Sequence, residues 1–145
     1  MLENPKVNIK IKLSALWTSV IFCYVYGDYF ELYVPEKVDS LITGVNILGS
    51  PTKLLIASIV LAIPSVMVAF SVLLTPKINR FLNILFGSLF TAMMLLIAIS
   101  SLTPWYSFYV FLAILESIIT SLIVWSAWTW PKEISTEQAV HTERV

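Results

Sequence analysis

The stretch LLIASIVLAIPSVMVAFSVLL, at residues 54–74, contains no charged side chain. The hydrocarbon core of a bilayer is about 30 Å thick, which takes about 20 apolar residues of α-helix to cross. Lipid offers no partner for backbone N–H and C=O groups, so a crossing segment has to bond its own backbone internally. The sequence therefore predicts a transmembrane helix over residues 54–74.

Three further apolar stretches have the same length, at residues 13–34, 81–100 and 105–130. Residues that break helices separate them: Pro35, Pro51, Pro76 and Pro104. We therefore expect an all-α fold, an antiparallel bundle of four transmembrane helices over residues 13–130. Residues 1–12 form a short segment before the bundle, and the polar residues 131–145 are expected to be a disordered tail.

Composition agrees with a membrane protein. Hydrophobic residues make up 58% of the chain and charged residues 12%, whereas soluble domains are near one quarter charged. Nine basic residues balance nine acidic ones, which argues against a nucleic-acid-binding protein. The single cysteine, Cys23, and the single histidine, His141, exclude an internal disulfide and a Cys/His metal site. We expect neither a metal nor a cofactor.

Orientation follows from the lysines and arginines of the short loops, which favour the cytoplasmic side. Lys37 and Lys53 lie in the loop after the first span. The other seven basic residues lie on the opposite side: Lys6, Lys10, Lys12, Lys77, Arg80, Lys132 and Arg144. Both termini are therefore expected in the cytoplasm. In the loop at residues 35–52, Val38, Leu41, Ile42 and Val45 recur at helical spacing and predict a short amphipathic helix, ended by Gly44.

Small and polar residues mark the faces on which membrane helices pack together. Each span has one such stripe: Trp17, Ile21, Tyr24 and Asp28; Ser58, Ala62, Ser65 and Ala69; Asn83, Gly87, Thr91 and Ala98; Tyr109, Ala113, Glu116, Thr120 and Ala127. We expect these stripes to meet in the bundle interior. Asn83 lies near the start of its span, so it is expected to cap that helix rather than join an interior site.

Glu116 is the feature that suggests a function, because it lies near the middle of the last span. An ionised acid at that depth costs roughly 2.5–3.5 kcal/mol, and no lysine or arginine lies at a similar depth. Glu116 is therefore either protonated and hydrogen-bonded, or it lines a wet cavity. If the first and last helices are neighbours, the cavity would be lined by these candidate ligand-binding residues: Glu116, Asp28, Tyr24, Tyr29, Tyr109 and Thr120.

Three segments resemble a family of small bacterial membrane proteins of unknown function: KLSALW at residues 12–17, YGDYFELYVP at 26–35 and VWSAWTWP at 124–131. The resemblance covers nearly the whole chain. It implies a four-helix protein of the bacterial inner membrane and carries no activity with it.

We expect an integral membrane protein that binds a small or lipid-like ligand, hydrophobic or cationic, in a bundle cavity at Glu116. Two alternatives stay open. One is an accessory or assembly subunit that docks partner helices, and the other is a membrane isomerase that uses Asp28 and Glu116 as acid and base. Membrane lipids and a second copy of the chain, forming a homodimer, are the expected partners.

Overall fold

The computed structural model describes residues 6–131, and this part of the chain is helical without strands. Its elements follow in the order α1 (Ile9–Glu31), α2 (Lys37–Thr43), α3 (Pro51–Leu73), α4 (Pro76–Ser100), the 3₁₀ turn η1 (Pro104–Tyr106) and α5 (Ser107–Trp128). The predicted all-α bundle is confirmed. The predicted disordered tail falls outside the described residues, apart from Pro131.

Local signals set where the helices begin. The Asn8 side chain accepts a hydrogen bond from the Lys10 amide at 2.9 Å, and the Ser50 hydroxyl accepts one from the Lys53 amide at 3.3 Å. Such side chains satisfy amides that have no partner inside the helix. α4 begins at Pro76, before the predicted start at residue 81, because proline suits the first position of a helix.

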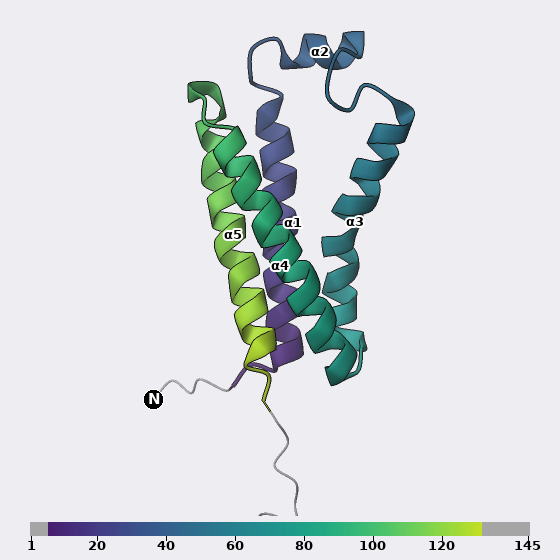
Figure 1. Ribbon diagram of the computed structural model, residues 1–145, viewed down its shortest axis with the longest axis vertical. Helices are drawn as coiled ribbons and strands as arrows, with labels where there is room; N and C mark the ends of the chain where they lie inside the picture. The colour runs from purple at the N-terminus through teal and green to yellow at the C-terminus, as the bar shows by residue number, and fades with distance from the viewer. Residues whose placement is uncertain (1–5, 132–145) are drawn as a thin grey trace, which may run out of the picture.

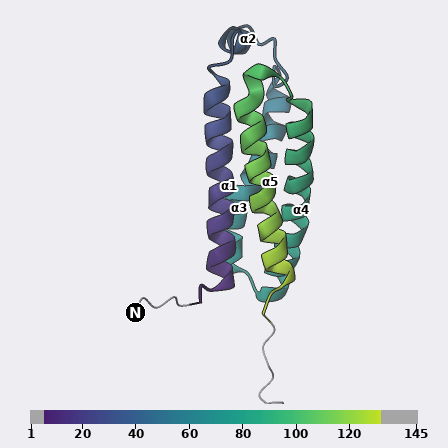
Figure 2. The same ribbon diagram turned by 90° about the vertical axis from the view of Figure 1, so that its left-hand side faces the viewer.

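α1, α3, α4 and α5 form the bundle, with α1 packed between α3 and α5, and α4 packed on α5. Figures 1 and 2 show these helices running up and down in alternation. We call the end that holds the α3–α4 turn the terminal end, because the described chain also starts and stops there; the other is the α2 end. α3 touches α4 little, and Figure 1 shows it leaning away toward the α2 end.

Four helices in the described part are long and apolar enough to cross a membrane. Their outward faces carry large exposed apolar side chains, such as Phe22, Leu55, Leu96 and Phe111. An exposed surface of this kind suits lipid and not water. The chain is an integral membrane protein.

The core centres on Trp17 of α1, which is fully buried. Its ring meets Phe90 of α4 edge to face, with centroids 6.0 Å apart, and Met67 of α3 and Ile123 of α5 belong to the same cluster. All four long helices therefore contribute to one apolar core.

The small and polar stripes of α4 and α5 do face the interior. On α4, Asn83, Gly87 and Ala98 are buried, and on α5 the buried residues include Ala113, Glu116, Thr120 and Ala127. Gly87 lets the two helices approach closely, because a Cβ there would lie only 2.8 Å from Cγ2 of Val124. The hydroxyls of Thr91 and Thr120 then meet across this contact at 2.6 Å.

The stripe predicted for α3 was wrong. Ser58, Ala62, Ser65 and Ala69 are exposed, and the buried residues of α3 are Pro64, Met67 and Ser71. The Ser58 hydroxyl donates to its own helix, to the Leu54 carbonyl at 2.8 Å, so it needs no partner helix. α3 packs on the bundle through the face that carries Pro64, Met67 and Ser71, which leaves its small-residue stripe facing lipid.

The connection between α1 and α3 contains the predicted short helix, α2, which ends at Gly44 in the left-handed conformation with φ of 72°. A salt bridge anchors it to α1, because Nζ of Lys37 lies 2.6 Å from Oε1 of Glu31. The Tyr106 hydroxyl of η1 donates to the same carboxyl oxygen at 3.3 Å. Glu31 thus joins the elements at the α2 end.

Candidate functional site

Glu116 is buried near the middle of α5, with 3% of its surface exposed. One face of the helix presents Ala113, Glu116, Ser117 and Thr120 to the other helices. The Glu116 backbone carbonyl accepts a hydrogen bond from the Thr120 hydroxyl at 2.9 Å. The buried acid therefore lies on the packed side of α5, as its stripe predicted.

The Glu116 side chain lines a cavity of about 20 Å³ between three helices. The lining residues come from α1 (Cys23, Tyr24 and Gly27), from α4 (Met94) and from α5 (Tyr109, Leu112, Ala113 and Glu116). A cavity of roughly 10–15 Å³ is enough to hold one water molecule. The space thus has room for one molecule of about that size.

Tyr24 supplies a polar group that the protein itself leaves unsatisfied. Its hydroxyl is buried and has no hydrogen-bond partner among residues 6–131. Its ring is held against Phe90 of α4, with the centroids 6.3 Å apart. A buried polar group without a partner is costly, so such a hydroxyl indicates an occupant such as a water or a ligand.

The residues that line this cavity include an acidic side chain and no basic one. The acidic side chain is that of Glu116. The salt bridge found within residues 6–131 joins Lys37 to Glu31 at the α2 end and does not involve Glu116. Glu116 therefore has no cationic partner in the described part of the chain.

The structure brings together three of the predicted site residues, Glu116, Tyr24 and Tyr109, at one cavity. Thr120 lies one turn farther along α5 and bonds to Thr91 instead. Asp28 and Tyr29 are exposed on α1, and the Tyr29 hydroxyl lies 2.9 Å from that of Tyr33. Asp28 does not line the cavity, so the paired acid and base that an isomerase needs do not share one pocket here.

Residues 3–136 match the family of unknown function DUF6326. The chain belongs to this family. No curated protein and no solved structure matches it at a significant level. The resemblance inferred from the aromatic-rich segments is thus confirmed, and the case for a function rests on the chemistry of the site.

A second buried polar cluster in this DUF6326 chain lies toward the terminal end. The indole Nε1–H of Trp17 donates to Oδ1 of Asn83 at 2.8 Å, and the Ser71 hydroxyl approaches the same oxygen at 3.4 Å. The Asn83 amide donates to Oδ1 of Asn79 at 2.6 Å, and the Asn79 amide donates to the Ser71 carbonyl at 2.6 Å. The cluster thereby joins α1, α3 and α4.

The expectation that Asn83 caps its helix was therefore wrong. α4 starts at Pro76, which places Asn83 inside the helix, where its side chain is fully buried. Asn79 was missed altogether, although its spacing of four residues from Asn83 puts both on one helical face. Cys23, Gly27, Met94 and Leu112 of the cavity were also missed, because apolar and small residues in a span resemble ordinary packing.

Proposed function

We propose that this integral membrane protein binds a small cation of the ammonium type at Glu116. The observation that carries the proposal is a buried carboxyl group facing a cavity that has no basic lining residue. Intramembrane acids of this kind face partners or cavities and commonly mark sites for ions or ligands. A bound cation would supply the missing counter-charge.

The cavity chemistry favours ammonium over a metal ion. Tyr24 and Tyr109 both line the space, and aromatic rings attract ammonium groups through their π faces. The unpartnered Tyr24 hydroxyl can accept a hydrogen bond from an N–H group, as can the Glu116 carboxylate. The described residues contain no group of three or more acidic, histidine or cysteine side chains placed to hold a metal.

The cavity volume favours a small ligand over a lipid-like one. About 20 Å³ admits an ion close to water in size, and a larger amine or a sterol-like molecule would require the lining side chains to move apart. A quaternary ammonium ion such as choline is too large for this space. Size therefore separates the candidate ligands in a direct test.

The distribution of basic residues supports cytoplasmic termini, and the resemblance to small bacterial membrane proteins is what suggests the bacterial inner membrane. Lys10, Lys12, Lys77 and Arg80 lie at the terminal end, whereas Lys37 and Lys53 lie toward the α2 end. Cytoplasmic loops carry the excess of lysine and arginine. The cavity would then lie in the outer half of the bilayer, because its lining residues belong to the halves of α1, α4 and α5 nearer the α2 end.

The test is thermal unfolding of the purified protein in detergent, with ammonium chloride, sodium chloride or choline chloride at equal ionic strength. We expect ammonium chloride to raise the midpoint temperature relative to choline chloride, since a ligand that binds only the folded state stabilises it. Glu116→Gln should abolish the difference. Glu31→Gln, a change of the surface acid bonded to Lys37, should leave it intact.

Equal midpoints in ammonium and choline salts for the unaltered protein would overturn the proposal. So would an ammonium effect that survives in a folded Glu116→Gln protein. Co-purification of a stoichiometric partner that depends on Glu116 would instead support the accessory-subunit alternative, in which the acid bonds across a docking interface.

A further inference from the structure

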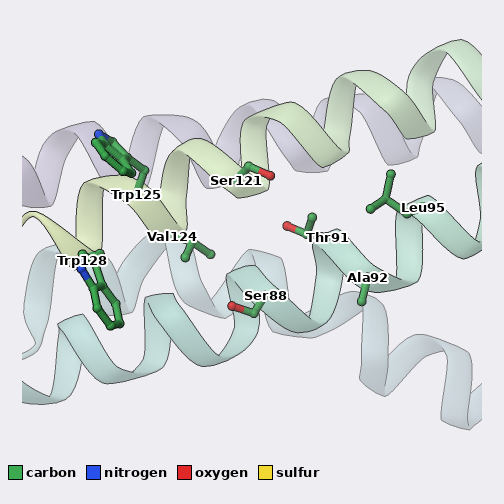
Figure 3. A pocket seen from close by; sticks show the side chains of 8 residues that line it. All are labelled: Ser88, Thr91, Ala92, Leu95, Ser121, Val124, Trp125 and Trp128. Atoms are coloured by element: carbon green, nitrogen blue, oxygen red, sulfur yellow. The ribbon is translucent and has the colours of Figure 1, made fainter.

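A groove of about 550 Å³ lies on the outer surface of the bundle, between α4 and α5. Figure 3 shows the side chains that line it: Ser88, Thr91, Ala92 and Leu95 from α4, and Ser121, Val124, Trp125 and Trp128 from α5. In this view Trp128 lies toward one end and Leu95 toward the other, with Thr91 and Ser121 between them. The groove is separate from the Glu116 cavity and opens toward the lipid.

Small side chains create this groove. The helix surfaces are recessed at three small residues, Ser88, Ala92 and Ser121, which lie between the bulky Trp128 and Leu95 (Figure 3). The lining residues of α5, from Trp128 to Ser121, cover about 10 Å at about 1.5 Å per residue, and Figure 3 shows the α4 lining continuing beyond them to Leu95. One leaflet contributes roughly half of a 30 Å core, so the groove is comparable in length to the acyl-chain layer of one leaflet.

The terminal end of the groove is positively charged. Arg80 of α4 donates from Nη2 to the carbonyl of Trp128 at 3.3 Å, and Trp128 lines the groove. Lys77 lies one turn before Arg80. Neither side chain forms a salt bridge within residues 6–131. Tryptophan and arginine at one helix end are typical of the depth where lipid headgroups lie.

We propose that this groove binds an anionic glycerophospholipid, with one acyl chain along Ser88, Ala92 and Val124 and the phosphate beside Arg80 and Lys77. Charge complementarity decides the occupant, because basic residues at the end of an apolar groove match a phosphate at the end of an acyl chain. One phospholipid thus occupies a fixed site on α4 and α5, in contrast to the bulk lipid that surrounds the protein.

A second copy of the chain suits the groove less well, because two of its three hydroxyls, those of Thr91 and Ser121, already have partners. Thr91 donates within its own helix to the Gly87 carbonyl at 2.8 Å and lies 2.6 Å from the Thr120 hydroxyl. Ser121 donates to the Ser117 carbonyl at 2.7 Å. Interhelical hydrogen bonds drive much of helix association in membranes, and these two side chains offer few.

The test is native mass spectrometry of the purified protein in detergent, titrated with dioleoyl phosphatidylglycerol or dioleoyl phosphatidylcholine. We expect one tightly bound phosphatidylglycerol and at least tenfold weaker binding of phosphatidylcholine. Ser88→Leu, which fills the groove, should lower the affinity for phosphatidylglycerol at least tenfold, whereas Ser88→Ala leaves the groove open and binding unchanged. Ser58→Leu on the exposed face of α3 is the matched control and should bind normally.

The charge is tested separately. Arg80→Gln and Lys77→Gln should each weaken phosphatidylglycerol binding several-fold and leave phosphatidylcholine binding unchanged, while Lys53→Gln at the other end has no effect. Equal binding of both lipids, or Ser88→Leu binding like the unaltered protein, would overturn the proposal. A dimer that Ser88→Leu converts to a monomer without a change in lipid binding would assign the groove to a second copy instead.

Discussion

The indole of Trp17 on α1 and the side-chain amide of Asn83 on α4 are joined by a 2.8 Å hydrogen bond inside the bundle, and both residues are fully buried. The bond connects two helices that are far apart in the sequence. Asn83 is in turn held by Asn79, so the indole meets an acceptor that is already oriented.

Removing this hydrogen bond should destabilise the bundle. Trp17→Phe takes away the donor and leaves the Asn83 oxygen less well satisfied, and we expect a loss of about 1–3 kcal/mol in the free energy of unfolding. Trp125→Phe, at an exposed position on α5, should change it by less than about 0.5 kcal/mol. Unfolding in mixed detergent and denaturant measures both, and equal losses would contradict the assigned role.

Gly87 should tolerate no larger side chain while Val124 is present. A Cβ at Gly87 would lie 2.8 Å from Cγ2 of Val124, so Gly87→Ala forces α4 and α5 apart, at a cost of about 1–3 kcal/mol. Adding Val124→Ala should recover most of that loss. Gly27→Ala is the matched change, because its Cβ would meet Tyr109 at an ordinary 3.5 Å, and it should be neutral or stabilising. Thermal midpoints in detergent test all three.

The Thr91–Thr120 contact should couple α4 to α5 weakly. Their hydroxyls are 2.6 Å apart, and interhelical hydrogen bonds in a membrane average about 0.6 kcal/mol. A double-mutant cycle with Thr91→Val and Thr120→Val should give a coupling energy of that size. Each hydroxyl has one proton and also lies within hydrogen-bond distance of a carbonyl of its own helix, that of Gly87 or Glu116. A coupling near zero would mean that both protons go to these carbonyls and that none is shared between the two threonines.

Tyr24→Phe tests the role of the Tyr24 hydroxyl in ammonium binding while it keeps the aromatic ring that packs in the bundle. The change removes a buried hydroxyl that has no partner in the described part of the chain, so folding should be preserved. If an ammonium ion donates to this hydroxyl, its stabilising effect should fall several-fold in the variant. Tyr29→Phe, at an exposed tyrosine on the same helix, should leave the effect unchanged. An undiminished effect in Tyr24→Phe would remove Tyr24 from the site.

Topology is tested with single cysteines in a Cys23→Ser background. Asn46→Cys reports on the α2 end and Lys77→Cys on the terminal end. In intact cells a membrane-impermeant maleimide should label the first and spare the second, because the excess of basic residues at the terminal end predicts that this end faces the cytoplasm. The reverse labelling would invert the orientation.

The four spans were predictable because hydropathy and the need to hydrogen-bond the backbone internally can be judged for each segment by itself, as residues 54–74 illustrate. The inward faces of α4 and α5 were predictable too. A carboxyl group such as that of Glu116 is costly in contact with lipid, and a glycine such as Gly87 favours close helix packing. The face of α3 was not, because Ser58 satisfies its hydroxyl on its own helix and Ala62 packs as well against lipid as against protein. Small residues therefore mark a helix interface only where a neighbour approaches.

The candidate site was predictable in part for the same reason. A buried acid such as Glu116 stands out in any apolar segment, whereas the inclusion of Tyr24 and Tyr109 depended on α1 lying beside α5. Asp28 shares a helical stripe with Tyr24 but lies farther toward the α2 end, and it is exposed. Which turn of a helix reaches a cavity depends on tertiary packing, and no pattern within one span records it.

The cavity is lined mainly by α1 and α5, the first and the last of the transmembrane helices in the described part of the chain. Because a chain is synthesised from its N-terminus, α1 waits in the membrane while α3 and α4 are made, and Tyr24 has no Glu116 beside it until α5 is inserted. The cavity can therefore form only after α5 has been inserted, and a ribosome that stalls before α5 leaves a membrane-inserted chain without it.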